Sequence, residues 1–515
     1  MITSSTLSTP RRLWATLGRV LIIVGVAVIA VVVVSWAVGV QVELDGGNLP
    51  RLAMYNAEAH FTALETDRAA QPVVPIPTTA PAIDRRPEAL WPAYRGETGD
   101  GTYDHGIRTD WPSDGLPRLW HQPIGGGYAS FVAADDRLFT IEQRRDREVV
   151  TAYDSATGRE LWAHGWETLF QEMMGGDGPR ATPTWDDGRL FALGAAGELR
   201  ALDAATGELR WRTNILADAG ATNLQWAMAA SPLVVDGMVV VLPGGGNGRS
   251  VAAYNANSGD IEWTALSDVQ GYTAPMLVEL AGVRQILVVT AGRAAGLAVE
   301  DGTLLWEHPW VTSTGPPNIS MPVVIGGARL FLSAGYGHGG ALIDIAETRG
   351  QLSARERWRT IRMKNRFSTS VLYEGHLYGF DESILACIDA ETGELAWKGG
   401  RYGHGQLLLA DGHLVVLTER GDVVLVRATP DGHDELARFA AIRGKTWNTP
   451  TIADGRLFVR NTTEMAAFNI EPEANARRRQ EKLVGFAWLR SPTRVCVWLW
   501  TPWGRTTSRA SSSTR

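Results

Sequence analysis

Short runs of alternating apolar and polar residues, separated by turn residues, make up most of this chain. In Asp187-Gly188-Arg189-Leu190-Phe191, a turn pair leads directly into such a run. This pattern predicts β-hairpins, because glycine accepts a positive φ and aspartate closes a turn with its own side chain. The signal recurs at residues 135–139, 187–191, 236–239, 282–286, 326–330, 374–378, 411–414 and 454–458.

A second pattern sets the architecture, since large aromatic residues recur at intervals of 39 to 52 residues. Four of them end a run of one shape, which is Asp-Ala-Xaa-Thr-Gly-Xaa-Xaa-Xaa-Trp at residues 203–211 and 389–397 and a variant of it at residues 154–162 and 255–263. A period of this length with short strands is typical of a propeller with four-stranded blades. The residues predicted to dock one blade on the next are Trp120, Trp162, Trp211, Trp263, Trp306, Trp358, Trp397 and Phe439. The sequence therefore predicts an all-β, eight-bladed propeller over residues 91–470.

The closure of the ring follows from the two ends of the repeat region. Trp120 precedes the first complete hairpin, whereas the last segment, residues 463–470, has no tryptophan strand of its own. Pairing these two strands would remove two exposed sheet edges at once. We predict that the strand around Trp120 completes the C-terminal blade.

The N-terminal region differs in kind from the repeats. Residues 20–40 carry no charge and are long enough to cross a bilayer core as a helix. Arg11, Arg12 and Arg19 precede this run, and the first acid, Glu43, follows it. The positive-inside rule therefore predicts that residues 1–19 are cytoplasmic and that residues 20–40 form a single inner-membrane anchor with a periplasmic propeller. A cleaved signal peptide and a twin-arginine export signal are the alternatives.

The segments that flank the propeller are predicted to lie outside its sheets. Residues 41–90 are expected to be a linker, with a short helix between Leu49 and Leu64 and a proline-rich spacer over residues 71–81. The basic tail, residues 471–515, is expected to be disordered or to result from a frame shift, or else to lie on a membrane surface. Residues 41–476 carry a net charge of −18, which disfavours a nucleic-acid partner.

The repeat resembles that of pyrroloquinoline quinone (PQQ) enzymes and their non-enzymatic relatives. The opening Leu90-Trp91-Pro92-Ala93-Tyr94-Arg95-Gly96 looks like the start of bacterial PQQ-like propeller proteins. Family alcohol dehydrogenases commonly carry adjacent cysteines, and quinohaem members add a Cys-x-x-Cys-His site. This chain has neither feature, because Cys387 and Cys496 are far apart. The resemblance also extends to the cofactor-free propeller subunit of the outer-membrane barrel assembly machinery, which is a lipoprotein.

Residues just before the first strand of each blade are expected to lie nearest the central axis. Aligning the repeats brings a group of cations, amides and aromatic rings to one channel mouth: Tyr128, Arg180, Tyr272, Asn318, Arg366, Trp447 and Asn448. Such a group suits an anionic planar ligand, a quinone among them, or lines a water-filled channel. The echoing runs at residues 335–339 and 401–405 each carry one histidine, but their spacing supplies no third ligand, so no metal site is predicted.

Two functions remain open at this stage. The first is a binding or scaffold module that docks a protein or another component of the cell envelope, with no cofactor and no catalytic residues. The second is a dehydrogenase that oxidises an alcohol or a sugar with PQQ and calcium. The absence of adjacent cysteines and of a haem motif favours the first hypothesis.

Overall fold

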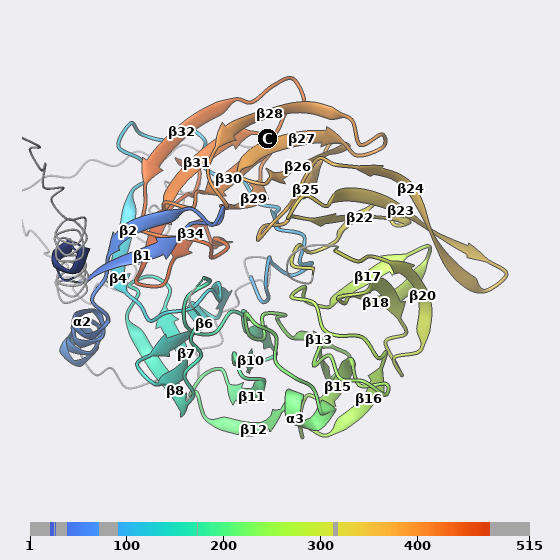
Figure 1. Cartoon of the computed structure of the whole chain (residues 1–515), viewed down its shortest axis with the longest axis horizontal. Coiled ribbons are helices and arrows are strands. Elements are labelled where there is room, and N and C mark those ends of the chain that lie inside the picture. The colour runs from blue at the N-terminus through green and yellow to red at the C-terminus, as the bar shows by residue number, and fades with distance from the viewer. Residues whose placement is uncertain are drawn as a thin grey trace, which may run out of the picture.

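The computed structural model describes residues 21–24, 26, 39–71, 91–172, 174–312 and 318–473. Within these residues, eight antiparallel sheets stand in a ring around a central axis (Figure 1). Each sheet has four antiparallel strands, ordered from the axis outwards, and one sheet also gains the short parallel strand β3 (Thr102–Tyr103) beside its innermost strand. The prediction of an all-β propeller with eight four-stranded blades is confirmed.

The strands follow the repeat in chain order. Blades one to four are β5–β8 (Val132–Ala134, Arg137–Arg144, Arg147–Asp154, Glu160–Glu167), β9–β12 (Thr184–Asp186, Arg189–Leu193, Glu198–Asp203, Leu209–Asn214), β13–β16 (Leu233–Val235, Met238–Val241, Val251–Asn255, Ile261–Ala265) and β17–β20 (Met276–Leu280, Val283–Val289, Arg293–Leu297, Leu304–Pro309). Blades five to eight are β21–β24 (Val323–Ile325, Arg329–Ala334, Gly339–Thr348, Gln351–Thr360), β25–β28 (Val371–Tyr373, His376–Asp381, Ile384–Asp389, Leu395–Arg401), β29–β32 (Gln406–Ala410, His413–Leu417, Asp422–Arg427, Glu435–Ala440) and β33–β35 with β4 (Thr451–Ala453, Arg456–Arg460, Glu464–Asn469, Arg118–Pro123). A short helix, α3 (Ile215–Ala219), follows blade two.

The ring closes as predicted, by insertion of an N-terminal strand into the last blade. Strand β4 pairs antiparallel with β35, and Trp120 stands opposite Ala467. The Trp120 indole then donates a hydrogen bond of 3.0 Å to the Ser155 carbonyl in blade one. Closure therefore joins residues about 350 positions apart in sequence, which removes both free edges of the ring.

The recurrent tryptophan packs on the turn of the following blade. Trp162 Nε1 donates to the Ala204 carbonyl at 3.1 Å, and its ring lies against Gly207. A Cβ at Gly207, where φ is +76°, would lie 2.6 Å from that ring. Glycine is required there both for the positive φ and for the close approach. The repeat therefore encodes a contact between blades as well as a turn within one.

Two of the predicted docking residues use different partners. The Trp306 indole donates to the side chain of Gln285 in its own blade. Phe439 packs edge-on against Trp111 and Phe468, with ring centroids 5.7 and 5.0 Å away. Both residues are buried, so they still fill the core between neighbouring blades.

The segment predicted as a linker, residues 41–90, is structured in its first part, so that prediction needs correction. Strands β1 (Val40–Leu44) and β2 (Pro50–Met54) form a hairpin, and helix α2 (Ala57–Ala70) follows it. The expected helix at Leu49–Leu64 begins only after Asn56, whose side chain caps α2 by accepting from the N–H of Ala59. Local alternation around a Gly-Gly-Asn turn favours a hairpin over an earlier helix start.

Other predictions about the ends fall largely outside the described residues. These include the cytoplasmic segment 1–19, most of the anchor 20–40, the spacer up to residue 90 and nearly all of the tail 471–515. Among the helices that the structure describes, none combines the length and the apolar character needed to cross a membrane.

Candidate functional site

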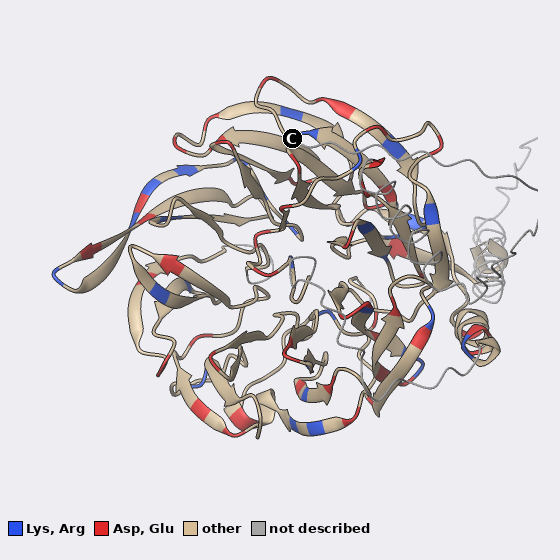
Figure 2. Ribbon diagram, turned by 180° about the vertical axis from the view of Figure 1, so that it is seen from behind, with Lys and Arg blue, Asp and Glu red and all other residues tan. Residues whose placement is uncertain are grey.

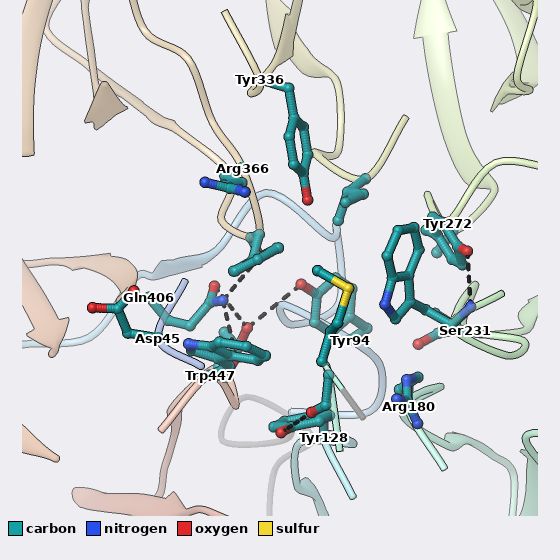
Figure 3. Close-up of a pocket in the computed structure, with 18 of the residues that line it drawn as sticks. Asp45, Tyr94, Tyr128, Arg180, Ser231, Tyr272, Tyr336, Arg366, Gln406 and Trp447 are labelled. Atoms are coloured by element: carbon teal, nitrogen blue, oxygen red, sulfur yellow. Dashed lines mark hydrogen bonds between the residues drawn. The ribbon is translucent and has the colours of Figure 1, made fainter. Parts of the chain in front are cut away.

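Every blade places residues at the same end of the central axis. In most blades the strand nearest the axis is short. The residues that precede this strand line the centre of the ring. There they surround a cavity of about 430 Å³ (Figure 3). Its lining includes Tyr128, Arg180, Trp226, Ser231, Tyr272, Ala274, Ile319, Tyr336, Arg366, Phe367, Gln406, Trp447 and Thr449 from the blades, and Asp45, Asn48, Tyr94, Met174 and Gly175 from other segments.

Aromatic rings make up much of the wall. Trp447 lies between Tyr128 and Phe367, with ring centroids 5.4 and 4.8 Å away. Across the cavity, Trp226 and Tyr272 meet edge to face with centroids 6.3 Å apart. Burial raises the pKa of the Tyr272 hydroxyl to about 12, so that this group stays protonated at neutral pH. The wall therefore offers flat apolar surfaces with hydroxyl and indole donors among them.

Two arginines bring positive charge to these walls. Arg180 donates to the carbonyls of Gly178 and Gly176 and stacks over Tyr128 at 5.6 Å. Among the described residues no carboxylate forms an ion pair with Arg180, and burial lowers its pKa, although the charges of Glu172 and Asp177 act against this shift. Arg366 stacks over Tyr336 at 4.2 Å, and its nearest carboxylate, on Glu382, is 3.9 Å away. The cavity therefore carries cations that the protein itself neutralises only weakly.

Of the seven residues predicted at the channel mouth, five line this cavity: Tyr128, Arg180, Tyr272, Arg366 and Trp447. The other two predicted residues have different roles. The amide of Asn318 donates to the carbonyls of Thr290 and Trp310, and both of those residues belong to the preceding blade. Asn448 likewise donates to the carbonyls of Gly127 and Ala129. Their side chains are buried and tie blade to blade, because an amide N–H₂ can satisfy two loop carbonyls at once.

The floor of the cavity comes from a segment that the prediction did not place. Residues 91–103 cross from blade one, where Trp91 pairs with Ala133, to blade seven, where β3 (Thr102–Tyr103) pairs parallel with β29. Buried Arg95 fixes this crossing by donating to the carbonyls of Leu407 and Asp100. Tyr94 is thereby held on the axis, where it forms part of the cavity wall (Figure 3). This crossing gives the cavity a floor, and we call the cavity together with this floor the cup.

The tip of the β1–β2 hairpin forms part of the rim. Gly46 donates its N–H to Glu419 Oε1 at 2.5 Å, and it lies flat on the ring of His404. A Cβ at Gly46 would be 2.4 Å from that ring, so a larger residue does not fit. Asp45 and Asn48 on either side reach the cavity. The alternation that flanks this Gly-Gly-Asn turn was the signal that could have located the hairpin, but not its docking site.

The side chains near this cavity that could ligate a metal lie apart from one another. Within the described residues, no three His, Cys, Asp or Glu side chains gather as a metal-binding group. Asp45 brings a carboxylate to the wall, but its oxygens already accept from Arg51 at 3.0 Å and from the N–H of Gly47 at 2.9 Å. Cys387 is buried inside blade six, away from the cavity lining. His338 packs on Trp310, and His404 packs on Phe367.

Comparison with known proteins bears on the family. Residues 145–399 match the family model described as "Outer membrane protein assembly factor BamB". The outer membrane protein assembly factor BamB of Yersinia pestis is 23% identical over 308 residues, which cover 57% of this chain and 75% of that protein. Over residues 145–399 this chain is therefore similar to BamB-type propellers.

Solved structures of PQQ-like propellers show the same fold. BamB from Moraxella catarrhalis superposes with a TM-score of 0.52 and 17% identity, covering 69% of this chain and all of that one. The quinohemoprotein alcohol dehydrogenase from Comamonas testosteroni gives a TM-score of 0.56 and 13% identity, covering 81% of this chain and 84% of that enzyme. An assembly factor and an oxidoreductase therefore share this propeller fold, so the fold alone does not assign an activity.

Proposed function

We propose that this chain is a membrane-anchored binding module of the bacterial cell envelope. In this proposal residues 20–40 span the inner membrane once, and the propeller stands in the periplasm, where its cavity holds a segment of a partner protein. The uncharged run with its preceding arginines supports the anchor. The similarity to an assembly factor of outer-membrane proteins supports the binding role.

The observation that carries the binding role is the composition of the cup. Its aromatic rings and arginines are the residue types that dominate the energetics of protein interfaces. Because Tyr94 forms a floor, the cavity suits a single side chain or a chain terminus of the partner better than a segment that passes through the ring. Arg180, which forms no ion pair with a carboxylate in the described part of the chain, favours an acidic group on the partner. We therefore propose a partner segment with an apolar or aromatic side chain next to a carboxylate.

Nucleic acid is a poor candidate for the partner. Residues 41–476 carry an excess of 18 negative charges, and acidic and basic residues are interspersed over the outer strands (Figure 2). Phosphate backbones require a concentrated positive surface. We propose a protein partner on this ground as well.

A site-directed photocrosslinker tests this proposal in cells. Benzoylphenylalanine at Trp226, on the cavity wall, should give a crosslinked envelope protein that is lost when Arg180→Ala is added. The same crosslinker at Ile261, which begins the outermost strand of blade three, is the matched control and should give no such product. Equal products at both positions, or none at Trp226, would contradict the proposal.

The dehydrogenase hypothesis is tested in parallel on purified protein. We expect that addition of PQQ with Ca²⁺ gives no bound quinone absorbance and no reduction of an artificial electron acceptor by ethanol or glucose. The feature that favours the dehydrogenase hypothesis is the placement of Arg180 and Arg366 beside aromatic rings, which suits a planar anion such as a quinone. Quinone binding and acceptor reduction that are both abolished by Arg366→Ala would establish the dehydrogenase instead.

A further inference from the structure

The β1–β2 hairpin has one entirely apolar face. Its register pairs Val40 with Met54, Val42 with Leu52, and Leu44 with Pro50. Because side chains alternate along a strand, these six residues share one side of the hairpin. The other side presents Gln41, Glu43, Arg51 and Ala53.

Much of this apolar face is exposed, the reverse of the usual arrangement, whereas Val40 and Leu44 on the same face are partly buried. Val42 is 65% exposed, Leu52 is 80% exposed and Met54 is 78% exposed. Leu49, in the turn, adds a fourth exposed apolar side chain at 65%. A two-stranded sheet on a folded domain normally turns its apolar side inward. A contiguous exposed apolar patch therefore marks an interaction surface.

Contacts at both ends hold the hairpin in this orientation. At the tip, Gly46 bonds to Glu419 of blade seven. At the base, the N–H of Tyr55 donates to the Gly39 carbonyl at 2.8 Å, and α2 follows directly. Helix α2 is bound to the propeller through Arg68, which donates to the Pro123 carbonyl at 2.7 Å and lies 3.2 Å from Glu160. The apolar face is therefore presented by a fixed support.

The chain that precedes the hairpin identifies what covers this face. The uncharged run of residues 20–40 leads into β1 without an intervening charge or spacer. At about 3.3 Å per residue, Val42 lies within roughly 7 Å of the end of that run. The headgroup layer of a bilayer is about 5–7 Å deep on each side of the hydrocarbon core. A chain that leaves the membrane at residue 40 therefore keeps this part of the hairpin at the lipid surface.

We propose that the apolar face of the β1–β2 hairpin, made by Val42, Leu49, Leu52 and Met54, lies in the headgroup and acyl boundary of the bilayer. This proposal rests on the membrane anchor proposed above and gives the protein a second contact with the membrane. The hairpin tip reaches the rim of the cavity through Asp45 and Asn48, so the proposal places this rim beside the membrane. The partner segment would be one that lies close to the bilayer.

Fluorescence quenching by brominated lipids tests this contact in the full-length protein. In a Cys496→Ser background, Leu52→Cys is labelled with an environment-sensitive probe, and the protein is reconstituted in phosphatidylcholine vesicles with or without brominated acyl chains. Ile261→Cys is the control, since Ile261 is 49% exposed and lies beside the Asn255–Gly259 turn, at the opposite end of the strands from the cavity. Cys387 is fully buried and should not be labelled.

We expect a blue-shifted emission at position 52 that brominated lipid quenches, and an unshifted, unquenched emission at position 261. Vesicle flotation separates the two proposals. If the protein floats with the vesicles but position 52 is not quenched, the hairpin contact is wrong and the anchor stands. If the protein does not float, both are wrong. Efficient disulfide crosslinking between two copies of Leu52→Cys would overturn the lipid contact in favour of a second copy.

Discussion

The indole Nε1 of Trp211 donates a hydrogen bond of 2.9 Å to the carbonyl of Ala256, one blade further along the chain. The same indole ring lies on Gly259, where a Cβ would approach it to 2.7 Å. The tryptophan of one repeat thus packs on the turn of the next repeat and donates a hydrogen bond to it. This contact joins two neighbouring blades. The stability of the ring should therefore depend on each of these contacts.

Replacement of Trp211 by alanine should destabilise the propeller by about 3–5 kcal/mol, the usual cost of truncating a buried large aromatic residue. Trp211 is buried between two regular blades, so its removal opens a cavity that its neighbours cannot fill. Thermal or urea unfolding checks this.

Gly259→Ala should also destabilise the propeller, because φ is +78° there and the added methyl meets the ring of Trp211. Gly237→Ala is the control, since φ is +76° but nothing lies within 4 Å of its added methyl. An unchanged unfolding midpoint for Trp211→Ala would show that the blades do not depend on this contact.

Gly46→Ala should release the hairpin tip from the cavity rim. The added methyl would overlap the His404 ring and displace the N–H from Glu419, at a cost of about 1–3 kcal/mol. We expect faster hydrogen exchange over residues 40–54, with little change in the blades. The neighbouring Gly47→Ala is the control, because its Cβ would lie 4.0 Å from His404 and would meet only the Asp45 side chain more closely, at 3.2 Å. Exchange that is equally slow in both variants would rule out the tip contact as the hold on the hairpin.

Glu148 should make the stability of the propeller fall as pH rises. Burial raises the pKa of this carboxyl from 4.5 to about 7. Oε1 accepts from the N–H of Ala195, while Oε2 has no partner in the described structure. The folded state therefore binds this proton more tightly than the unfolded state does. The resulting stabilisation is complete below pH 4.5 and is lost as the pH rises through about 7, an effect on the order of 3 kcal/mol.

Unfolding midpoints at pH 5 and pH 8 check this prediction. Glu148→Gln keeps the shape and cannot ionise, so it should lose less stability than the wild type between these two values. Glu374→Gln, on an exposed turn, is the matched control and should follow the wild type. If Glu148→Gln and the wild type respond equally to pH, the carboxyl at position 148 does not titrate as described.

The orientation of the chain can be checked by labelling with a membrane-impermeant maleimide. In a Cys496→Ser background, Ile261→Cys should react in intact spheroplasts, because the propeller is proposed to face the periplasm. Ser4→Cys, within the segment proposed to be cytoplasmic, should react only after lysis. The opposite labelling pattern would show that the proposed orientation is reversed. Labelling of both sites in intact spheroplasts would contradict the proposed membrane span.

Part of the candidate site follows from the sequence because the repeat is regular. Once the blades are aligned, the residues before each first strand, such as Arg180 and Trp447, are placed at one end of the axis. The alignment does not say how a side chain turns at that position. Asn318 and Asn448 occupy equivalent places, but they turn to loop carbonyls of an adjacent blade. That choice depends on which carbonyls the neighbouring loop leaves without partners.

The sequence by itself determined the strands, the number of blades and the closing strand, because these depend on local alternation and on turns repeated along the chain. The floor and the rim of the cup could be located only from the tertiary structure. Its floor at Tyr94 and its rim at Asp45 come from segments hundreds of residues away from their partners, Leu407 near Arg95 and Glu419 at Gly46. Neither segment carries a repeat that could align it with a blade. The positions of both segments are fixed by packing and hydrogen bonds to residues that are distant in sequence.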